Sequence, residues 1–311
     1  MFEEDFHRPV LLEETLLGLD PQPGNIFFDG TVGGGGHSGE ILAKILPGGF
    51  LYGTDQDPFA LEQARKHLCA ISDRFQLDSI NFSNALGKSQ MPLLDGILLD
   101  IGVSSHQLDN AERGFSFQKE GPLDMRMDPR QDLTAATIVN TFEEKELADI
   151  IYQFGEERFS RRIARAIALR RSEKPFENTK DLSDFVAGLV PWPGNHPATR
   201  TFQALRIATN RELSVLSAAI PLAVDALKPG GRLAIISFHS LEDRIVKTAF
   251  RKLGTGCQCP PRFPCVCQAV PRIEVLTRKP ITASPEEIEA NPRARSAKLR
   301  IAKRTEEKGC P

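Results

Sequence analysis

The sequence has no long hydrophobic run, no strong excess of charge and few cysteines among its 311 residues. No apolar stretch approaches the ~20 residues that a membrane-spanning helix needs. The formal net charge is −2, so nucleic-acid binding would depend on local basic patches. Six cysteines are too few in a chain of this length for a secreted disulfide scaffold. The first residues are acidic and lack the basic and apolar regions of a signal peptide, so we expect a cytoplasmic protein that does not enter a membrane.

Residues 27–39 contain the most informative pattern of the chain. The apolar pair Phe27-Phe28 ends at Asp29, five glycines stand among residues 30–36, and a helical pattern follows. Glycine tolerates positive φ and lacks the Cβ that would block the close approach of a ligand. The N-terminus of the following helix attracts polar and anionic groups. A flexible linker would not be flanked by an apolar run and an amphipathic helix, so the pattern predicts a ligand-binding turn between a strand and a helix.

Strand and helix patterns alternate in the first third of the chain. Short uninterrupted apolar strands between helices are typical of a parallel sheet that is covered on both faces. Right-handed crossovers place the carboxyl ends of all these strands at one edge, where ligands bind. We predict strands at 25–29, 50–54, 79–82 and 96–100, and helices at 38–45 and 58–70.

The alternation stops after Ser105, and the next hundred residues contain no convincing strand. Helical patterns at 143–154, 158–171 and 181–189 are separated by proline-rich breaks. The sheet pattern then resumes with a turn at 228–231, a strand at 232–238, and two last strands at 272–277 and 296–302. We therefore expect one α/β domain made of two segments, 1–104 and 212–311, with an inserted helical domain at 105–211.

The residues near the glycine turn narrow the choice of ligand. Asp55 lies about 20 residues beyond the glycines, where an acceptor for ribose hydroxyls belongs in nucleotide-binding sheets. This position suits both a nicotinamide dinucleotide and S-adenosylmethionine. The turn does not follow G-x-G-x-x-G cleanly, and Asp29 suits the ammonium group of an amino acid better than a pyrophosphate. The Pro229-Gly230-Gly231 turn before a late strand is also typical of methyltransferases, so a nicotinamide-dependent enzyme remains the alternative.

Strings of uncommon residues follow one another along nearly the whole chain. Besides the glycine turn, they are HRPVLL at 7–12, LDIGVSS at 99–105, RGFSF at 113–117, GPLDMRMD at 121–128, FGEE at 154–157, HPATR at 196–200, FQALRI at 202–207, SFHSLEDR at 237–244 and NPRARSAKLR at 291–300. In this order they resemble the MraW family of bacterial ribosomal RNA methyltransferases. The resemblance implies a Rossmann-like α/β fold of the class I S-adenosylmethionine-dependent methyltransferases, with an inserted helical domain.

The resemblance also implies a reaction. It is the transfer of a methyl group from S-adenosylmethionine to the N4 amine of a cytidine, cytidine 1402 of 16S rRNA, in the 30S ribosomal subunit. The second functional class that we consider is a nucleic-acid-binding protein of the same fold without activity. The sequence does not decide the oligomeric state, and a homodimer is one alternative.

The cofactor site follows from the same resemblance, and each position has a physical interpretation. Asp55 would accept hydrogen bonds from the ribose, and Phe82 would stack on adenine at the end of the third strand, although core packing would also explain this ring. Asp100 ends the fourth strand beside the reacting centre, and Gln107 follows in the next loop. The residues implied are Gly35, Gly36, His37, Asp55, Phe82, Asp100 and Gln107.

The chemistry requires an orienting group and a proton acceptor. The lone pair of cytosine N4 is delocalised into the ring, so the amine must be aimed at the methyl group and must lose a proton. The Asp/Asn-Pro-Pro-aromatic string of DNA amino-methyltransferases is absent, because Asp100-Ile101-Gly102 stands in its place. We expect Asp100 and the backbone carbonyls that follow it to orient the amine, with Asp124 and His239 as secondary catalytic candidates. A structural hydrogen bond would explain His239 equally well.

Basic residues recur at helical spacing within 158–165. Four arginines, Arg158, Arg161, Arg162 and Arg165, share one face of this predicted helix, and Phe159, Ile163 and Ala166 share another. Such a face would bind RNA phosphates, or it would be a solvated face paired with neighbouring glutamates. A single-stranded or splayed-out cytidine is the expected target, because N4 of a paired base is occupied. A second basic cluster comprises Arg293, Arg295, Lys298, Arg300, Lys303 and Arg304.

Four cysteines form a C-x-C…C-x-C array, at Cys257, Cys259, Cys265 and Cys267. Four thiolates so close together are able to hold a tetrahedral zinc ion. The spacing differs from the commoner C-x-x-C, and prolines restrict the loop between the two pairs. A reduced, cysteine-rich loop is the favoured interpretation, and we assign no metal.

Overall fold

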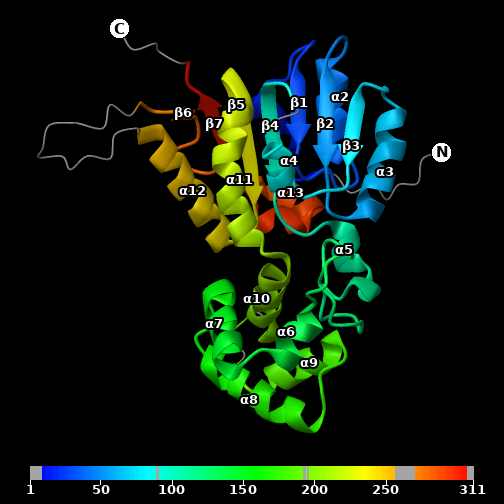
Figure 1. The fold of residues 1–311 in the computed structure, drawn as a ribbon, viewed down its shortest axis with the longest axis vertical. Coiled ribbons are helices and arrows are strands. Elements are labelled where there is room, and N and C mark those ends of the chain that lie inside the picture. Colours follow the sequence, from blue (N-terminus) through cyan, green and yellow to red (C-terminus); the bar gives the residue numbers. More distant parts are fainter. Residues whose placement is uncertain (1–8, 89–90, 192–193, 195, 256–269, 307–311) are drawn as a thin grey trace, which may run out of the picture. The chain divides into compact units, whose positions relative to one another are not determined.

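The computed structural model describes residues 9–88, 91–191, 194, 196–255 and 270–306 (Figure 1). The chain divides into two compact units, Met1–Gly102 together with Leu213–Pro311, and Val103–Glu212. The first is called the sheet unit and the second the helical unit. Among the described residues, no helix combines the length and the apolar character needed to cross a membrane.

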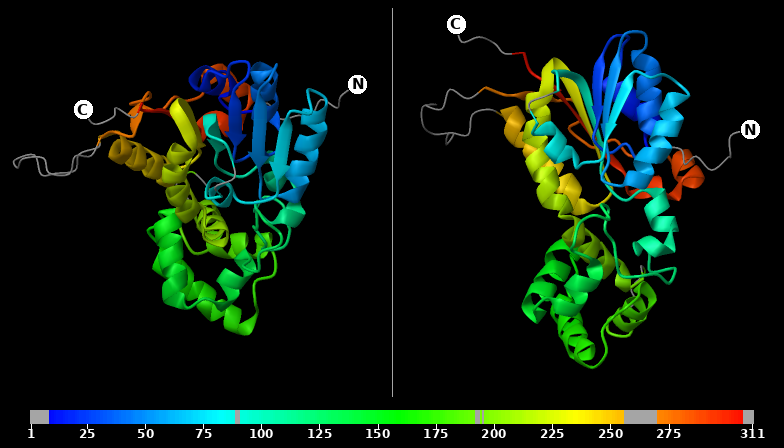
Figure 2. Two further views of the ribbon diagram at one scale, coloured as in Figure 1. Left: turned by 45° about the horizontal axis from the view of Figure 1, so that its top comes forward. Right: turned by 45° about the vertical axis from the view of Figure 1, so that its right-hand side comes forward.

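The sheet unit contains one seven-stranded sheet with the order β3-β2-β1-β4-β5-β7-β6. Strands β3, β2, β1, β4 and β5 run parallel to one another, whereas β7 is antiparallel to both β5 and β6 (Figure 2). The expected Rossmann-like α/β sheet with a helical insertion is confirmed. The strands are β1 Ile26–Asp29, β2 Phe50–Thr54, β3 Phe75–Asp78, β4 Leu94–Asp100, β5 Leu227–Ser237, β6 Ile273–Val275 and β7 Lys298–Arg304.

Both faces of the sheet are apolar because helices cover both. Successive side chains of a strand point to opposite faces, so Phe27 and Leu98 belong to one buried cluster while Phe28 and Leu99 belong to another. The first cluster includes residues of α1 Leu12–Leu19, α2 Gly36–Ile45 and α3 Pro58–Cys69, and the second includes residues of α4 Phe82–Leu86, α11 Glu212–Ala226 and α12 Ser240–Thr255. The remaining helices of this unit are α13 Pro285–Ala290 and the 3-10 helix Pro292–Ser296.

The third strand lies earlier than the sequence pattern predicts. The prediction of a strand at 79–82 was wrong, because β3 covers Phe75–Asp78 and pairs with β2 from Phe75 opposite Leu51 onward. The strand ends at Asp78, and Asn81 caps α4, because its side chain accepts a hydrogen bond from Ser83 N at 2.8 Å. Phe82 is consequently the first residue of a helix and does not end a strand.

The predicted turn at 228–231 lies within the bounds of β5. Leu227 pairs with Leu94, and the next pair is Arg232 with Gly96, so residues 228–231 are an irregularity in the ladder. Gly230 has a φ of 84°, and Lys228 Nζ lies 2.7 Å from Asp95 Oδ2. Residues 228–231 thus form a local turn, but β5 begins before them, at Leu227.

The helical unit has a hydrophobic core of its own, which includes Ile151, Ile163 and Leu205. Helices α7 and α10 approach closely at Gly155, where an added Cβ would lie 2.4 Å from the carbonyl oxygen of Arg200. The only β pairing among the described residues of this unit is an isolated bridge between Pro122 and Asn178. Its helices are α5 Ser105–Asp109, the 3-10 helix Ala111–Arg113, α6 Ala135–Thr141, α7 Glu144–Gly155, α8 Ser160–Glu173, α9 Thr179–Ala187 and α10 Ala198–Asn210.

Candidate functional site

The candidate site lies where the strand order of the sheet reverses. Strand β1 is flanked by β2 and β4, so the chain moves away from β1 in one direction through β3 and in the other from β4 onward. The carboxyl ends of β1 and β4 are Asp29 and Asp100. In open α/β sheets, ligands bind outside the carboxyl ends of the strands at this reversal point.

The glycine turn joins β1 to α2 at this edge. Gly33 and Gly35 have φ values of 54° and 90°, which are unfavourable for other residues. A Cβ added at Gly33 would meet only the carbonyl oxygen of Thr31, at 4.0 Å. Gly35 precedes α2 and provides no side-chain cap, so the first N–H groups of the helix have no partner from a cap. Open space therefore lies at Gly33, whereas an added Cβ would be 3.2 Å from Ala64 Cα at Gly35 and 2.5 Å from Pro9 Cγ at Gly36.

Asp55 follows β2 and is connected to the glycine turn. Its Oδ2 accepts a hydrogen bond from Gly33 N at 2.9 Å, and its Oδ1 accepts one from Asp57 N at 2.9 Å. Burial raises the pKa of Asp55 to about 6, and the two backbone hydrogen bonds act against this shift. At neutral pH the carboxylate is therefore ionised and able to accept further hydrogen bonds on its second lone pairs.

His37 and Asp100 face each other across the site. His37 is 7% exposed, and its Nε2 lies 3.1 Å from the carbonyl oxygen of Val10. A carbonyl only accepts, so Nε2 carries the proton. Burial lowers the pKa of His37 to about 4, and the neutral ring presents an unprotonated Nδ1 at 3.6 Å from Asp100 Oδ2.

Asp100 has the most perturbed acid group of the site. Burial raises its pKa to about 8, and the negative charges of Asp29 and Glu242 add to this effect. Its Oδ1 is shielded from solvent and makes no hydrogen bond within the described parts of the chain. A buried polar atom without a partner is uncommon and frequently marks a functional position.

Comparison with known proteins assigns the family. A model of the MraW methylase family matches residues 4–305. The chain belongs to this family. The ribosomal RNA small subunit methyltransferase H of Heliobacterium mobile is 53% identical over 311 residues, which cover 97% of this chain and 99% of that protein. The protein of the same name from Geobacter sulfurreducens is 52% identical over 306 residues, covering 96% and 98%.

Two further residues of the implied cofactor site in this MraW-family chain are Phe82 and Gln107. Phe82 is buried at the start of α4, and a Cβ added at Gly30 would lie 2.7 Å from the Cβ of Phe82. The ring thus belongs to the edge that holds the turn, as well as to the hydrophobic core. Gln107 belongs to the helical unit, where its side chain accepts from Ser104 N at 3.1 Å in a capping box at the start of α5.

The secondary catalytic candidates have evident structural partners. Asp124, in the helical unit, pairs with Arg126 at 2.7 Å. Burial acts to raise the pKa of Asp124, but the hydrogen bonds and charge of Arg126 outweigh it and lower the pKa. His239 Nε2 lies 3.0 Å from Oε1 of buried Glu242 but, like Asp100 Oδ1, makes no hydrogen bond among the described residues. The other oxygen of Glu242, Oε2, accepts from Phe238 N at 2.8 Å. The contacts of Asp124 favour a structural role for that residue.

Sequence reasoning missed the polar network that holds the turn. Asp29 is 1% exposed, and its Oδ2 accepts from the hydroxyl of Ser38 at 2.6 Å. Its Oδ1 accepts from Thr31 N at 3.0 Å. Burial raises the pKa of Asp29 to about 6, against the effect of these bonds. The available sequence signal for this network was Thr31, a short polar residue two positions after the strand-ending Asp29.

The two predicted basic clusters of this MraW-family chain differ in exposure and pairing. Arg161, Arg162 and Arg165 are exposed on α8 and make no ion pair within the described ranges, so pairing with glutamates is not observed. The C-terminal cluster does not form one free surface, because Arg300 is 5% exposed and pairs with Asp243 at 2.7 Å. The four cysteines of the C-x-C array lie outside the described residues.

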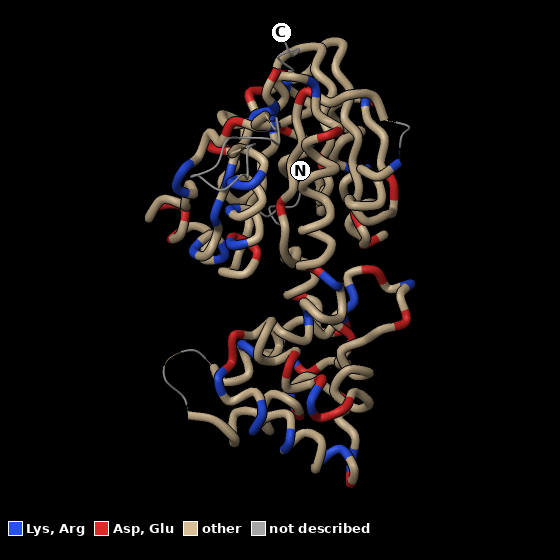
Figure 3. Tube along the Cα trace, turned by 60° about the vertical axis from the view of Figure 1, so that its left-hand side comes forward, with Lys and Arg blue, Asp and Glu red and all other residues tan. Residues whose placement is uncertain are grey.

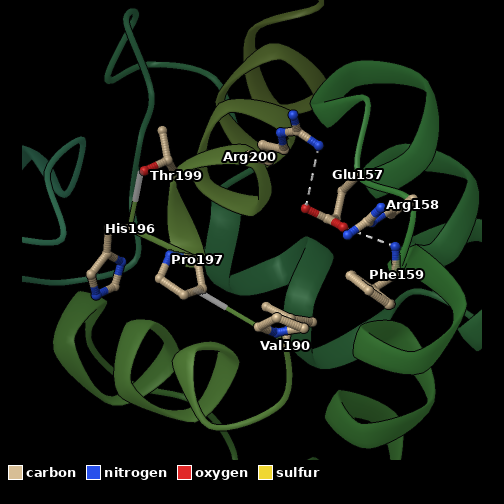
Figure 4. A pocket seen from close by; sticks show the side chains of 9 residues that line it. Glu157, Arg158, Phe159, Val190, His196, Pro197, Thr199 and Arg200 are labelled. Carbon is tan, nitrogen blue, oxygen red and sulfur yellow. Dashed lines mark hydrogen bonds and ion pairs between the residues drawn. The ribbon is translucent and has the colours of Figure 1, made fainter. Parts of the chain in front are cut away.

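A pocket of about 360 Å³ opens beside the start of α8 (Figure 4). The buried carboxylate of Glu157 accepts from Phe159 N at 2.8 Å and lies 3.9 Å from Arg200 Nη1. The guanidinium of Arg158 lies over the Phe159 ring, 4.8 Å from its centroid. The lining residues are Glu157, Arg158, Phe159, Val190, Pro191, His196, Pro197, Thr199 and Arg200.

The raised pKa of Asp100 predicts a falling stability of the cofactor-free protein above pH 6.5. The folded state keeps a proton up to about pH 8, whereas the unfolded state loses it near pH 3.8. The free energy of unfolding should therefore decrease as pH rises from 6.5 to 8, by at most about 1.4 kcal/mol per pH unit. His37 has completed its transition over this range, whereas Asp29 and Asp55, with pKa values of about 6, add to the decrease in the same direction near its lower end.

Urea denaturation at pH 6.5, 7.2 and 8.0 measures this dependence. Asp100→Asn keeps the shape of the side chain and should flatten the profile. If the natural protein and Asp100→Asn show the same slope, Asp100 is not the group that holds the proton.

Proposed function

We propose that this chain transfers a methyl group from S-adenosylmethionine to the N4 amine of a cytidine in the RNA of the small ribosomal subunit, cytidine 1402 of 16S rRNA. The observation that carries the proposal is the buried, unpartnered Oδ1 of Asp100 on the edge that also holds the open space at Gly33, at the reversal point of the sheet. Membership in a methylase family and the names of the relatives support the reaction and the class of RNA.

The residues at the strand ends fit S-adenosylmethionine. The open space at Gly33 and the N-terminus of α2 suit the amino-acid part, for which Gly35, Gly36 and the His37 backbone would provide the surface. Asp55, ionised at neutral pH, would accept from the ribose hydroxyls. Phe82 would provide an apolar surface for adenine. Gln107 is proposed as a further hydrogen-bonding partner.

The bound cofactor supplies an electrophilic methyl group on a positively charged sulfur. Asp100 has two properties that the amine substrate needs: a carboxyl oxygen that no other described group engages, and a pKa near neutrality. A cation in the site would favour the ionised carboxylate. In that form Asp100 orients the N4 amine through its N–H groups and takes up the proton that the amine loses. Proximity supplies the rest of the rate gain.

The helical unit is proposed to bind the RNA. Arg161, Arg162 and Arg165 project from α8, and the adjoining pocket adds the guanidinium groups of Arg158 and Arg200. Figure 3 shows the basic and acidic residues interspersed along the trace, in agreement with a net charge of −2. RNA attraction would therefore be local to such a face, and phosphate contacts there would make binding depend on salt.

Methyl transfer to isolated 30S subunits tests the proposal. Subunits from a strain without the homologous enzyme would be incubated with the protein and S-adenosylmethionine carrying an isotopic label in the methyl group. We expect label in one nucleotide, N4-methylcytidine at position 1402, identified by nuclease digestion and mass spectrometry. Binding of subunits without label transfer would support the inactive RNA-binding alternative, and label at a ring carbon or ribose oxygen would contradict N4 chemistry.

A further inference from the structure

One hydroxyl group connects the two strand ends of the candidate site. Thr31 Oγ1 lies 2.6 Å from Asp100 N and 3.4 Å from Asp29 Oδ1. A backbone N–H only donates, so the hydroxyl accepts from Asp100, and its own proton is directed to Asp29. The hydroxyl thus has one defined orientation between β4 and β1.

The position of this hydroxyl is explained by the end of the β1–β4 ladder. The last registered pair is Asp29 with Leu98, and the last backbone hydrogen bond runs from Gly30 N to Leu98 O at 2.9 Å. Beyond it the chain enters the glycine turn, and β1 offers no further carbonyl to the next inward N–H of β4, which belongs to Asp100. Thr31 Oγ1 accepts this hydrogen bond in place of a strand partner.

The other side of the network is equally well determined. Asp29 is nearly inaccessible to solvent, and it accepts from Thr31 N, Thr31 Oγ1 and the buried Ser38 hydroxyl. Ser38 belongs to α2, so the same carboxylate holds the start of the helix to the end of β1. A shift of the Thr31 hydroxyl would be transmitted to Asp100 through one short bond.

We propose that Thr31 is a positioning residue for the reaction, because its hydroxyl replaces the missing strand partner of Asp100 and fixes the Asp100 carboxyl relative to the glycine turn. The inference rests on the proposed methyl transfer, since it assigns Asp100 to the reacting centre. Thr31 itself touches neither cofactor nor substrate in this role. Its effect should appear in the turnover number, and not in the affinity for RNA.

The test compares Thr31→Val with Thr31→Ser. Valine keeps the shape of threonine but leaves Asp100 N without an acceptor, and serine keeps the hydroxyl without the methyl group. We expect Thr31→Val to lower kcat about tenfold or more, with KM for the ribosomal subunit unchanged, and Thr31→Ser to restore kcat to within about threefold of the natural protein. A role in packing alone would give the opposite order, because valine fills the same space.

The two proposals fail through different outcomes. An inactive natural protein would contradict the proposed function, whereas an active natural protein with Thr31→Val at full kcat would overturn the role of Thr31. Circular dichroism and thermal unfolding show whether each variant folds. If Thr31→Val does not fold, Thr31→Ala against Thr31→Ser gives the same comparison, and equal kcat for these two would also overturn the proposal.

Discussion

Replacing Asp100 by asparagine is expected to reduce methyl transfer by about 100-fold or more. Asparagine has the same shape and still offers an amide oxygen, but it does not take up a proton at neutral pH. The carboxyl that it replaces has an unpartnered Oδ1 at the end of β4, and its pKa of about 8 would be lowered by the positive charge of the bound cofactor. Single-turnover rates measured at saturating cofactor isolate this step from binding.

Asp73→Asn is the matched control for this variant. Asp73 is exposed in the loop before β3, so the same chemical change there should leave the rate unaltered. Calorimetric titration with S-adenosylhomocysteine should show that Asp100→Asn retains binding. Near-normal turnover of the cofactor-bound variant would contradict the role of Asp100 as proton acceptor.

Reversing two charges on α8, Arg161→Glu with Arg162→Glu, is expected to weaken RNA binding at least about tenfold. Both side chains are exposed and unpaired within the described chain. Each lost phosphate contact on single-stranded RNA should lower the slope of log affinity against log salt by about 0.7. Filter binding at salt concentrations from about 50 to about 300 mM measures both the RNA affinity and its dependence on salt.

The control for these arginines carries the same change of net charge elsewhere. Arg251→Glu with Lys252→Glu alters two adjacent exposed cations on α12 of the sheet unit. If this pair lowers affinity and salt slope equally, the effect arises from net charge and not from the α8 face. Cofactor affinity should be unchanged in both double variants, since α8 belongs to a separate unit.

Local sequence patterns predicted the bounds of a strand well where the strand is an apolar run that ends at a turn. Strand β2 has the predicted bounds, and β1 and β4 differ from prediction only at their first residues. Residues 79–82 were misassigned because Ile80 and Phe82 favour strands, while the deciding interaction is the cap made by Asn81. The hydrogen bond from Ser83 N to the Asn81 side chain thus outweighed the strand preference of Ile80 and Phe82.

Interactions between distant residues could not be predicted from local patterns. The bond between Thr31 Oγ1 and Asp100 N joins residues 69 apart in sequence, so only the assembled sheet brings them together. The same holds for Arg300, whose place in a basic string suggested a surface charge but whose partner Asp243 lies on another element. The turn between β1 and α2 was, in contrast, predicted from the spacing of its glycines alone.

The order of the sheet also has a consequence for synthesis on the ribosome. Strand β4 pairs with β5, yet the whole helical unit lies between them in sequence. While the chain is being made, β4 therefore remains an unpaired edge next to β1 until residues 227–237 have emerged, and unpaired strand edges attract other extended chains. The helical unit, with its own core, is completed during that interval. The growing chain therefore has an unpaired, aggregation-prone strand edge for as long as the helical unit takes to be translated.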